Sequence, residues 1–289
     1  MNSLQQDKEK VEQQKVAVVT GSSSGIGQEI SLKLARNDII IYATMRDPKK
    51  AEFLKSRAEK EKLSLKVVEL DVTKALSVRN AIQTITNEAS TIDVLVNNAG
   101  YGLGGAFEDL ELEEIKAQFE TNLFGLIRTT QAVLPIMRKQ KSGIIVNISS
   151  GAGRMGYPSR SAYVSTKFAV EGLTESMSYE LGPYGIKVVL VEPGFVKSKF
   201  SQAMINAKKS QDPNSPYLHL MQKMTTINNQ LERNGSTPED VANIVLTSIS
   251  SKNPNLRYLV GRDIEEWIKS KNSMTDAEFH DMMMKGMSN

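Results

Sequence analysis

Short apolar runs alternate with longer amphipathic stretches along this chain, and this alternation constrains the fold more than any other feature. The runs are rich in Val and Ile and short enough to be strands: Val16–Thr20, Ile39–Thr44, Leu65–Leu70, Asp93–Asn97, Gly143–Ser149, Lys187–Val191 and Arg257–Val260. Helical spacing of apolar residues, every three or four positions, fills much of what lies between: Ser24–Ala35, Val78–Ala89, Leu112–Arg138 and Tyr163–Leu181. Continuously apolar strands are typical of a parallel sheet with helices on both faces. The sequence predicts a doubly wound α/β fold with a seven-stranded parallel sheet.

One domain of this kind accounts for residues 1–289, because no repeat, second alternation or Pro/Gly linker marks a boundary. Residues 1–15 are expected to form a polar extension. Residues 199–235 interrupt the alternation and are predicted to be an insertion over the substrate pocket, followed by a helix that begins at Thr237-Pro238-Glu239-Asp240. Residues 268–289 are predicted to be a helical tail, in which Thr275-Asp276-Ala277-Glu278 has the pattern of a capping box.

Composition excludes several classes of function. The chain has no cysteine and only two histidines, His219 and His280, so disulfides, thiol catalysis and a metal site are not expected. Its 36 Lys and Arg against 33 Asp and Glu are scattered rather than gathered in a tract, which disfavours nucleic-acid binding. The polar start is unlike a signal peptide and no apolar run is long enough to span a membrane, so we expect a soluble, cytoplasmic protein.

A glycine-rich turn follows the first predicted strand. Its sequence is Gly21-Ser22-Ser23-Ser24-Gly25-Ile26-Gly27, and it opens the first helix, where small residues let the backbone approach a pyrophosphate. The spacing Gly-x-x-x-Gly-x-Gly departs from the general dinucleotide fingerprint, and a turn of this kind can also be merely structural. The turn nevertheless favours a Rossmann-type dinucleotide site.

The end of the second strand bears on which dinucleotide is bound. A carboxylate here would bind the ribose 2′-hydroxyl of NAD, yet no acid precedes Arg46. A guanidinium pairs with a 2′-phosphate, and Lys49 and Lys50 add positive charge, so NADP(H) is favoured over NAD(H). The alternative is a solvated basic loop without a ligand.

Five further motifs follow in order: Asn97-Asn98-Ala99-Gly100, Asn122, Ser149-Ser150, Tyr163-Val164-Ser165-Thr166-Lys167 and Pro193-Gly194. Together with the glycine turn, they make residues from about Val16 to Val196 resemble the classical short-chain dehydrogenase/reductase family. Within that family the stretches Tyr42–Asp47 and Ala162–Gly172 are most similar to NADP(H)-using hydroxysteroid and retinol dehydrogenases. This finer resemblance rests on fewer residues.

The tyrosine and lysine are four positions apart, so they share one face of a helix. A free phenol titrates near pH 10, and a nearby ammonium is expected to lower the pKa of Tyr163 so that it exchanges a proton with a carbonyl or alcohol oxygen. Ser150, thirteen positions earlier, is placed to hydrogen-bond the substrate oxygen, with Ser149 as the competing residue.

The resemblance implies a catalytic set of Asn122, Ser150, Tyr163 and Lys167, in which Lys167 also binds the nicotinamide ribose and Asn122 holds the active-site helix and a water. Helix packing is the alternative role for Asn122. Asp71 matches a position that contacts adenine, although it could equally cap the next helix. Ser198 stands where a threonine commonly touches the carboxamide. The full set of implied cofactor contacts is Gly21, Ser23, Ser24, Gly25, Ile26, Gly27, Arg46, Asp71, Val72, Asn98, Ala99, Gly100, Tyr163, Lys167, Pro193, Gly194, Val196 and Ser198.

The sequence constrains the substrate and the oligomeric state less than the fold. The stretch Phe195–Gly235 is expected to cover the crevice at the carboxyl ends of the strands. Its apolar side chains either line a lid over a lipid-like substrate or pack the lid onto the body: Met204, Leu218, Leu220, Met221 and Met224. The last helix, with Phe279, Met282, Met283 and Met287, covers the pocket, contacts a second subunit or completes the core. The resemblance implies a homodimer or homotetramer through Leu112–Arg138 and Tyr163–Leu181.

Three hypotheses for function follow. The first is an NADP(H)-dependent oxidoreductase that acts on a carbonyl or alcohol of an apolar, steroid-, retinoid- or lipid-like substrate. The second is a 3-oxoacyl-carrier-protein reductase, although the long insertion and tail argue against it. The third is an NADP(H)-sensing binding protein without catalysis, although such proteins tend to lose the tyrosine or the lysine.

Overall fold

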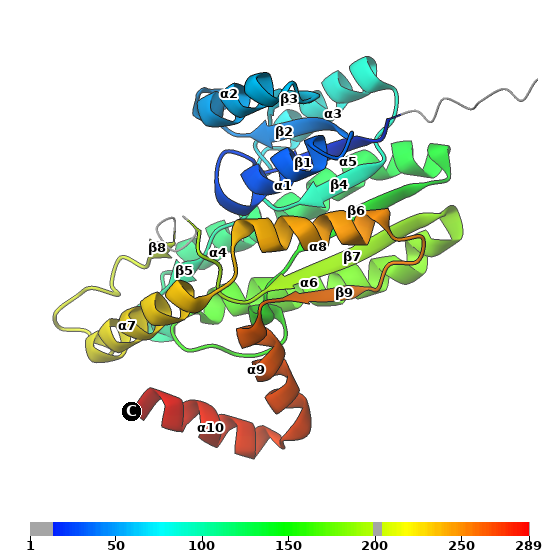
Figure 1. Cartoon of the computed structure of the whole chain (residues 1–289). Coiled ribbons are helices and arrows are strands. Elements are labelled where there is room, and N and C mark those ends of the chain that lie inside the picture. Colours follow the sequence, from blue (N-terminus) through cyan, green and yellow to red (C-terminus); the bar gives the residue numbers. More distant parts are fainter. Residues whose placement is uncertain (1–13, 199–203, 289) are drawn as a thin grey trace, which may run out of the picture.

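The predicted parallel sheet is present in the structure, a computed structural model that describes residues 14–198 and 204–288. Its strands are β1 (Val16–Thr20), β2 (Ile40–Met45), β3 (Leu65–Glu69), β4 (Val94–Asn97), β6 (Gly143–Ile148), β7 (Ile186–Pro193) and β9 (Arg257–Val260). All are parallel, in the order β3-β2-β1-β4-β6-β7-β9 (Figure 1). The doubly wound α/β fold with seven strands is therefore confirmed, whereas most of the N-terminal extension lies outside the described residues.

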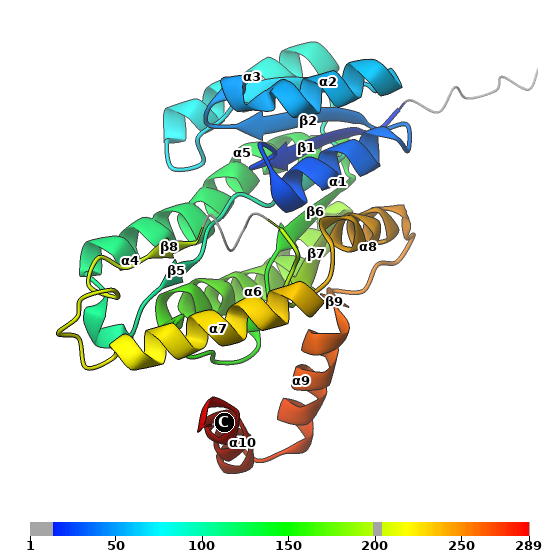
Figure 2. The same ribbon diagram turned by 60° about the vertical axis from the view of Figure 1, so that its left-hand side comes forward.

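The helices are α1 (Gly25–Ala35), α2 (Glu52–Glu61), α3 (Ala75–Ala89), α4 (Leu112–Phe119), α5 (Gly125–Gln140), α6 (Ser161–Leu181), α7 (Leu218–Asn234), α8 (Pro238–Ser250), α9 (Arg262–Ser273) and α10 (Asp276–Ser288). The capping box predicted for Thr275 and Glu278 forms before α10, and the helix start predicted at Thr237 is also a capping box, with Asp240. Two short strands that were not predicted, β5 (Leu103–Gly104) and β8 (Ile205–Asn206), pair in parallel. Figure 2 shows α9 and α10 extending from the body beyond β9.

The helix predicted over Leu112–Arg138 is present, but it is not a regular α-helix throughout. A π-helical turn at Glu120–Phe124 separates α4 from α5. Within it, the Asn122 side chain is buried and bonds in both directions to the backbone of Tyr101, accepting from its N–H at 3.0 Å and donating to its carbonyl at 2.9 Å. Amphipathic spacing does not reveal this interruption, because the turn is stabilised by a segment distant in sequence.

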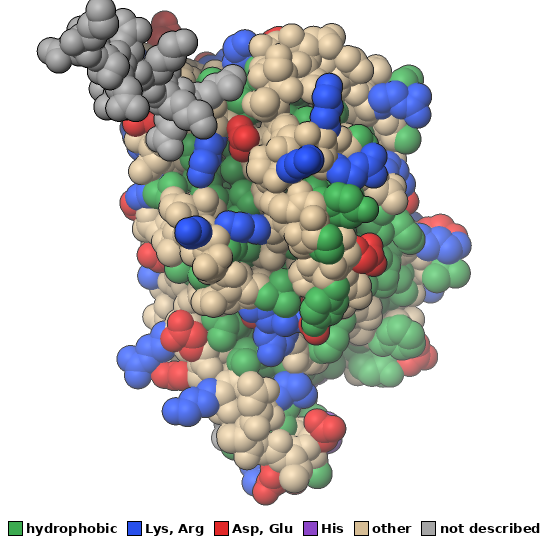
Figure 3. All heavy atoms as spheres, turned by 90° about the vertical axis from the view of Figure 1, so that its right-hand side faces the viewer, with side chains coloured by type: hydrophobic (Ala, Val, Ile, Leu, Met, Phe, Trp, Pro, Cys, Tyr) green, Lys and Arg blue, Asp and Glu red, His purple; other side chains and the backbone are tan. Residues whose placement is uncertain are grey.

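Charged side chains are dispersed on the surface. On the face drawn in Figure 3, Lys and Arg alternate with acidic and apolar groups rather than forming one continuous field. In the described ranges, no helix has both the length and the apolarity needed to cross a bilayer. No group of three or more His, Asp or Glu in those ranges is arranged to hold a metal ion.

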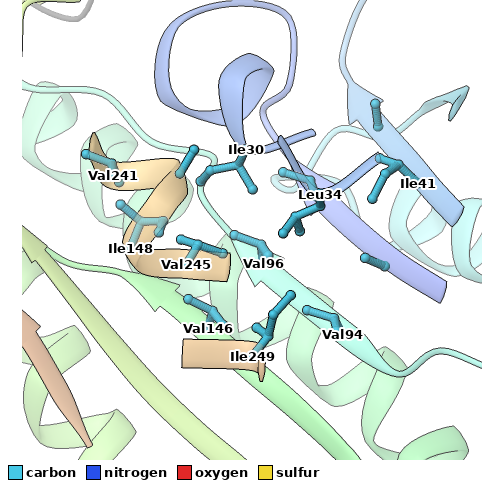
Figure 4. Close-up of a cluster of buried hydrophobic side chains, with 14 of the residues drawn as sticks. Ile30, Leu34, Ile41, Val94, Val96, Val146, Ile148, Val241, Val245 and Ile249 are labelled. Atoms are coloured by element: carbon cyan, nitrogen blue, oxygen red, sulfur yellow. The ribbon is translucent and has the colours of Figure 1, made fainter. Parts of the chain in front are cut away.

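Alternate residues of the strands point to opposite faces of the sheet and contribute to two hydrophobic cores, one on each face. On the first face, Val96 and Val146 pack with apolar residues of α1 and α8, among them Ile30 and Val245 (Figure 4). On the second face, strand residues pack against α3, α5 and α6. Burial on both faces explains why the strands are apolar throughout.

The strand order determines where a ligand can bind. From β1 the chain builds outward first through β2 and β3, and then on the other side through β4, β6, β7 and β9. In open α/β sheets, the crevice at such a reversal, beyond the carboxyl ends of the strands, is the usual ligand site. Here it lies between the segments that follow β1 and β4.

Candidate active site

A cavity of about 750 Å³ opens at the carboxyl ends of the strands. It is lined by segments that follow β1, β2, β3, β4, β6 and β7, and by residues of α6 and α9. Every residue predicted for the site lines it except Asn122. The cavity thus brings together residues that are up to 246 positions apart, from Gly21 to Trp267.

The glycine turn forms a close-packed cradle at the start of α1. Gly21 has φ +70°, and a Cβ there would lie 2.8 Å from the Cα of Ala99. A Cβ on Gly27 would lie 2.5 Å from the carbonyl oxygen of Gly21. Among the described residues, a Cβ at Gly25 would have only Ser198 within 4 Å, at 3.9 Å, which leaves the approach to the helix N-terminus open on their side. These residues fit a dinucleotide pyrophosphate, which needs backbone donors and no intervening side chain.

Thr20 fixes this turn to the segment after β4. Its hydroxyl oxygen accepts hydrogen bonds from the backbone N–H groups of Asn98 and Ala99, each at 3.0 Å. The Asn98 side chain returns a hydrogen bond to the carbonyl of Thr20 at 2.9 Å. Sequence reasoning did not assign Thr20 a role, although its position at the end of a buried strand was visible.

Arg46 and Asp71 lie at the ends of neighbouring strands. The Arg46 side chain is exposed at the cavity rim, and it forms no ion pair within the described part of the chain. Burial tends to raise the pKa of Asp71, but hydrogen bonds from Thr73 and the charges of Lys74 and Arg46 outweigh it, so the net shift is downward. Asp71 does not cap α3, because its carboxylate accepts from the N–H and hydroxyl of Thr73, at 3.0 and 2.7 Å, before the helix begins.

Three predicted catalytic groups line the same cavity: the Ser150 hydroxyl, the Tyr163 phenol and the Lys167 ammonium. Ser150 hydrogen-bonds Tyr163, whereas the Ser149 hydroxyl is buried without a partner in the described residues. Lys167 Nζ lies 5.7 Å from the centroid of the Tyr163 ring and donates to the carbonyl of Ile148 at 2.8 Å. Of the two serines, Ser150 is therefore the one whose hydroxyl reaches the phenol.

The expected electrostatic effect on the phenol is not what the structure shows. Burial raises the pKa of Tyr163, and this effect outweighs the hydrogen bond from Ser150 and the charge of Arg160, which both lower it. Burial also lowers the pKa of Lys167 to about 8, partly opposed by the carboxylate of Glu171. The prediction that an ammonium shifts the phenol downward was wrong because it left out the desolvation of both groups.

Asn122 lies behind this group rather than at the cavity surface. Besides its bonds to Tyr101, its amide donates to the hydroxyl of Thr166 on α6 at 3.3 Å. The π-helical turn therefore links the segment after β4 to the helix that carries the phenol and the ammonium.

Comparison with known proteins now decides the family. The family model for short chain dehydrogenases matches residues 15–209, which include the glycine turn, Ser150, Tyr163 and Lys167. The chain belongs to the short-chain dehydrogenase family. Membership in this family makes the protein an oxidoreductase.

Two curated relatives illustrate the similarity. This short-chain dehydrogenase is 37% identical over 266 residues to a 3-ketodihydrosphingosine reductase of Bacteroides thetaiotaomicron, which covers 91% of this chain and 94% of that one. It is 36% identical over 252 residues to human retinol dehydrogenase 8, with 84% and 80% of the two chains covered.

Solved structures agree in fold. A short-chain dehydrogenase from Streptomyces avermitilis superposes with a TM-score of 0.83 at 29% identity, covering 96% of this chain and 98% of that one. An alcohol dehydrogenase from Thermococcus sibiricus, solved with 5-hydroxy-NADP, gives a TM-score of 0.71 at 25% identity over 86% and 96% of the chains. A Burkholderia phymatum member solved with NAD gives 0.80 at 23% identity over 92% and 95%. Relatives of this fold thus include both kinds of dinucleotide complex.

The part of the cavity formed by the segments after β6 and β7 and by α9 has aromatic walls that sequence reasoning missed. Tyr157 and Trp267 stack with centroids 5.9 Å apart, and Phe195 meets Tyr157 edge-on at 5.9 Å. Met155 and Ile264 complete the apolar wall and pack with α10. No pattern in sequence links these positions, because they come from three separate segments that meet only in the fold.

Of the two roles left open for the apolar side chains of the insertion, the structure favours packing onto the body. None of its expected lining residues faces the cavity; of the described residues in that segment, Ile205 does. The pairing of β8 with β5 holds the beginning of the described segment, and Met221 and Met224 of α7 are buried away from the cavity. The packing alternative therefore holds for these methionines. The tail packs behind the pocket wall through Phe279, Met282 and Met283, while the side chain of Met287 lies outside the described residues.

A buried ionic network adjoins the site, because Glu192 precedes Pro193, which lines the cavity. Glu192, fully buried at the end of β7, lies 3.3 Å from Arg154 and 3.4 Å from Arg257. Arg257 also contacts Glu171 at 3.1 Å. Burial, followed by repulsion from Glu171, raises the pKa of Glu192 to about 7, although Arg154 opposes the shift. The network connects β7 and β9 with α6, one turn beyond Lys167.

Proposed function

We propose that this short-chain dehydrogenase is an NADP(H)-dependent oxidoreductase that transfers hydride between nicotinamide and the carbonyl or alcohol carbon of an apolar substrate. The observation that carries the proposal is the convergence of Ser150, Tyr163 and Lys167 on the cavity that also holds the glycine cradle. Candidate proton-transfer groups and a cradle suited to a dinucleotide thus share one enclosure, which supports the proposal. Neither a structural glycine turn nor an exposed Tyr–Lys pair accounts for this placement.

Tyr163 would supply the proton. Because its pKa is raised above the ordinary value for a phenol, it retains its proton at neutral pH and is suited to donate it to a carbonyl oxygen. Ser150, bonded to the same phenol, would hold that oxygen and stabilise charge that develops on it. The cofactor, when bound, supplies the hydride.

Lys167 would position the cofactor ribose. Its ammonium is buried and donates a hydrogen bond to the backbone carbonyl of Ile148, which fixes its position. With a pKa of about 8 it remains mostly protonated at neutral pH and keeps donors for ribose hydroxyls. Asn122 would act as a positioning residue that holds α6 through Thr166.

The preference for NADP(H) rests on Arg46. The exposed guanidinium lies at the rim next to Asp71, where a 2′-phosphate could take two parallel hydrogen bonds from it. No carboxylate that could select the 2′-hydroxyl instead precedes it on β2. The remaining cofactor contacts proposed are the predicted ones that line the cavity.

An apolar substrate fits the walls formed by Tyr157, Phe195 and Trp267. The relatives named for 3-ketodihydrosphingosine and retinol support a lipid-like or retinoid-like carbonyl or alcohol. We also propose, from family membership, a homodimer or homotetramer through α4–α5 and α6. Phe124 and Phe168 on these helices are 47% and 46% exposed in the single chain, which supports this assembly.

The test is NADPH oxidation against steroids, retinal, aliphatic aldehydes, small diketones and 3-oxoacyl thioesters, with NADH in parallel. Tyr163→Phe should lower kcat about 100- to 10,000-fold, the usual contribution of a general acid, while NADPH binding measured by nucleotide fluorescence is kept. The matched serine pair separates the two hydroxyls: Ser150→Ala should lose activity and Ser149→Ala should keep it.

Other outcomes identify the alternatives. Turnover confined to 3-oxoacyl thioesters would indicate a fatty-acid reductase. Tight NADPH binding with no turnover of any carbonyl would indicate a sensor. Full turnover by Tyr163→Phe would refute the catalytic assignment.

A further inference from the structure

Arg160 places a positive charge in the substrate half of the cavity. It is the residue before α6 and lies three positions before Tyr163, so the two side chains start about one helical turn apart. It lines the cavity together with Tyr157, Phe195 and Trp267. None of the roles described above requires a cation at this position.

The surroundings of this guanidinium are aromatic rather than acidic. Its central carbon lies 5.6 Å from the ring centroid of Tyr157 and 5.6 Å from that of Phe195. Its Nε is buried and has no hydrogen-bond partner within the described parts of the chain. Arginine carries five N–H donors in a planar fork, and ring faces offer them no carboxylate oxygen.

Two other arginines near this end of the cavity are neutralised. Arg154 pairs with Glu192, and Arg257 pairs with Glu171 and Glu175. In the described ranges, Arg160 forms no ion pair. Asp263, the acid that also lines this end of the cavity, instead accepts from the backbone N–H of Phe195 at 2.9 Å.

We infer that Arg160 forms an anion subsite and that the substrate is an apolar carbonyl compound that also bears a carboxylate. This inference deepens the proposed function and rests on it. An unpaired guanidinium between aromatic rings gains most from a planar partner that accepts two parallel hydrogen bonds. A carboxylate matches its single charge, whereas a doubly charged phosphate would leave excess negative charge among apolar walls.

The first experiment measures binding without catalysis. Trp267 is the single tryptophan of the chain and stacks on Tyr157 in the cavity wall, so its fluorescence reports occupancy. We expect octanoate to bind more tightly than methyl octanoate. Arg160→Met should weaken octanoate binding about 10- to 100-fold, the range for hydrogen bonds between charged groups, and leave the ester within about 2-fold.

Two further variants control for folding and for charge. Arg262→Met removes an exposed arginine outside the cavity and should change neither ligand. Arg160→Lys retains the charge but not the fork, and it should bind octanoate with intermediate affinity. Equal affinity of the wild-type protein for the acid and the ester would overturn the inference.

The second experiment uses 7-oxooctanoate and its methyl ester with NADPH. Arg160→Met should raise KM for the acid and leave kcat and KM for the ester nearly unchanged. An equal fall in kcat for both would show that Arg160 acts on Tyr163 and would overturn the anion subsite. If octanoate binding depends on Arg160 but no carbonyl is turned over with either nucleotide, the subsite stands and the proposed reductase activity fails.

Discussion

The two halves of the cavity are built in different ways. The nucleotide half, after β1 and β4, is held by backbone: Gly21 and Gly27 leave no room for a Cβ, and Thr20 joins the two segments through backbone N–H groups. The substrate half, after β6 and β7 and at α9, is formed by side chains such as Tyr157 and Trp267. A backbone site tolerates few sequences, whereas a side-chain site can be altered one residue at a time.

This difference matches the two tasks. A dinucleotide is common to many enzymes, so one backbone cradle serves all of them, while the substrate is particular to each. A buried ion pair between Glu192 and Arg257 also adjoins this half, because Glu192 precedes Pro193, which lines the cavity. Specificity in this chain is therefore expected to reside in the second half, and the predictions below test that division.

The largest effect is expected for Gly27→Ala. Its Cβ would lie 2.3 Å from the Asn98 amide nitrogen and 2.5 Å from the Gly21 carbonyl oxygen, so the cradle must shift. Overpacking of this kind costs about 1–3 kcal/mol of stability. The loss of two hydrogen bonds to a charged phosphate, at about 1.5–3 kcal/mol each, should weaken NADPH binding by roughly 100-fold or more. Urea denaturation and nucleotide fluorescence measure the two effects.

The matched control is Gly156→Ala, beside the substrate half. A Cβ there meets no atom of the described residues within 4 Å, and the φ of Gly156 lies outside the left-handed range. Stability and NADPH affinity should stay within about 0.5 kcal/mol of wild type. Equal damage from both substitutions would contradict the view that only the nucleotide half is fixed by its backbone.

The same division explains what was predictable from sequence. Strands and glycine cradle leave local signals, because burial on both faces demands apolar runs and a close turn demands glycine. The π-helical turn at Asn122 leaves none, since its partner Tyr101 lies 21 positions away. The contact of Tyr157 with Trp267 likewise depends on how α9 packs after the fold has formed.

The candidate catalytic residues could be predicted from the order of the motifs, whereas their protonation states could not. A spacing of four residues on a helix shows that Tyr163 and Lys167 share a face, but it does not show how strongly either group is desolvated. Both groups are buried, and burial disfavours the charged form of each. Charge effects inside a cavity therefore require the structure.

A smaller effect is expected at the rim of the nucleotide half. Arg46→Ser should weaken NADPH binding about 10- to 100-fold, the value of hydrogen bonds to a charged group, and leave NADH binding nearly unchanged. Lys50→Ser provides the control, because a flexible exposed lysine adds only a screened charge. If the two variants lost affinity for NADPH equally, the selectivity would come from general positive charge rather than from Arg46.

The buried charges that adjoin the substrate half predict a pH effect on stability. The pKa of Glu192 is raised to about 7, so between its ordinary value and pH 7 the folded chain retains a proton that the unfolded chain has lost. Stability contributed by this group is therefore present at low pH and is lost as the pH rises through about 7. Wild type should lose about 1–2 kcal/mol more than Glu192→Gln between pH 5 and pH 8.

Chemical denaturation at a series of pH values measures that difference. The glutamine retains acceptors and volume for Arg154 but cannot ionise. Parallel pH profiles for the two proteins would show that Glu192 has the same pKa in the folded and unfolded states. Burial of Glu192 would then make no pH-dependent contribution to stability.

The smallest effect concerns the link between the aromatic wall and α7. The Tyr157 hydroxyl donates to the side-chain oxygen of Asn228 at 2.8 Å, and burial raises the pKa of Tyr157 to about 12, so the donor keeps its proton over the usual range. Tyr157→Phe should cost about 0.5–1.5 kcal/mol of stability. Since the ring still stacks on Trp267, KM for a neutral apolar carbonyl should change by less than about 2-fold. Tyr157→Ala, which removes the ring, should raise KM further; a comparable rise in the phenylalanine variant would show that the contact with α7, and not the ring, shapes the substrate half.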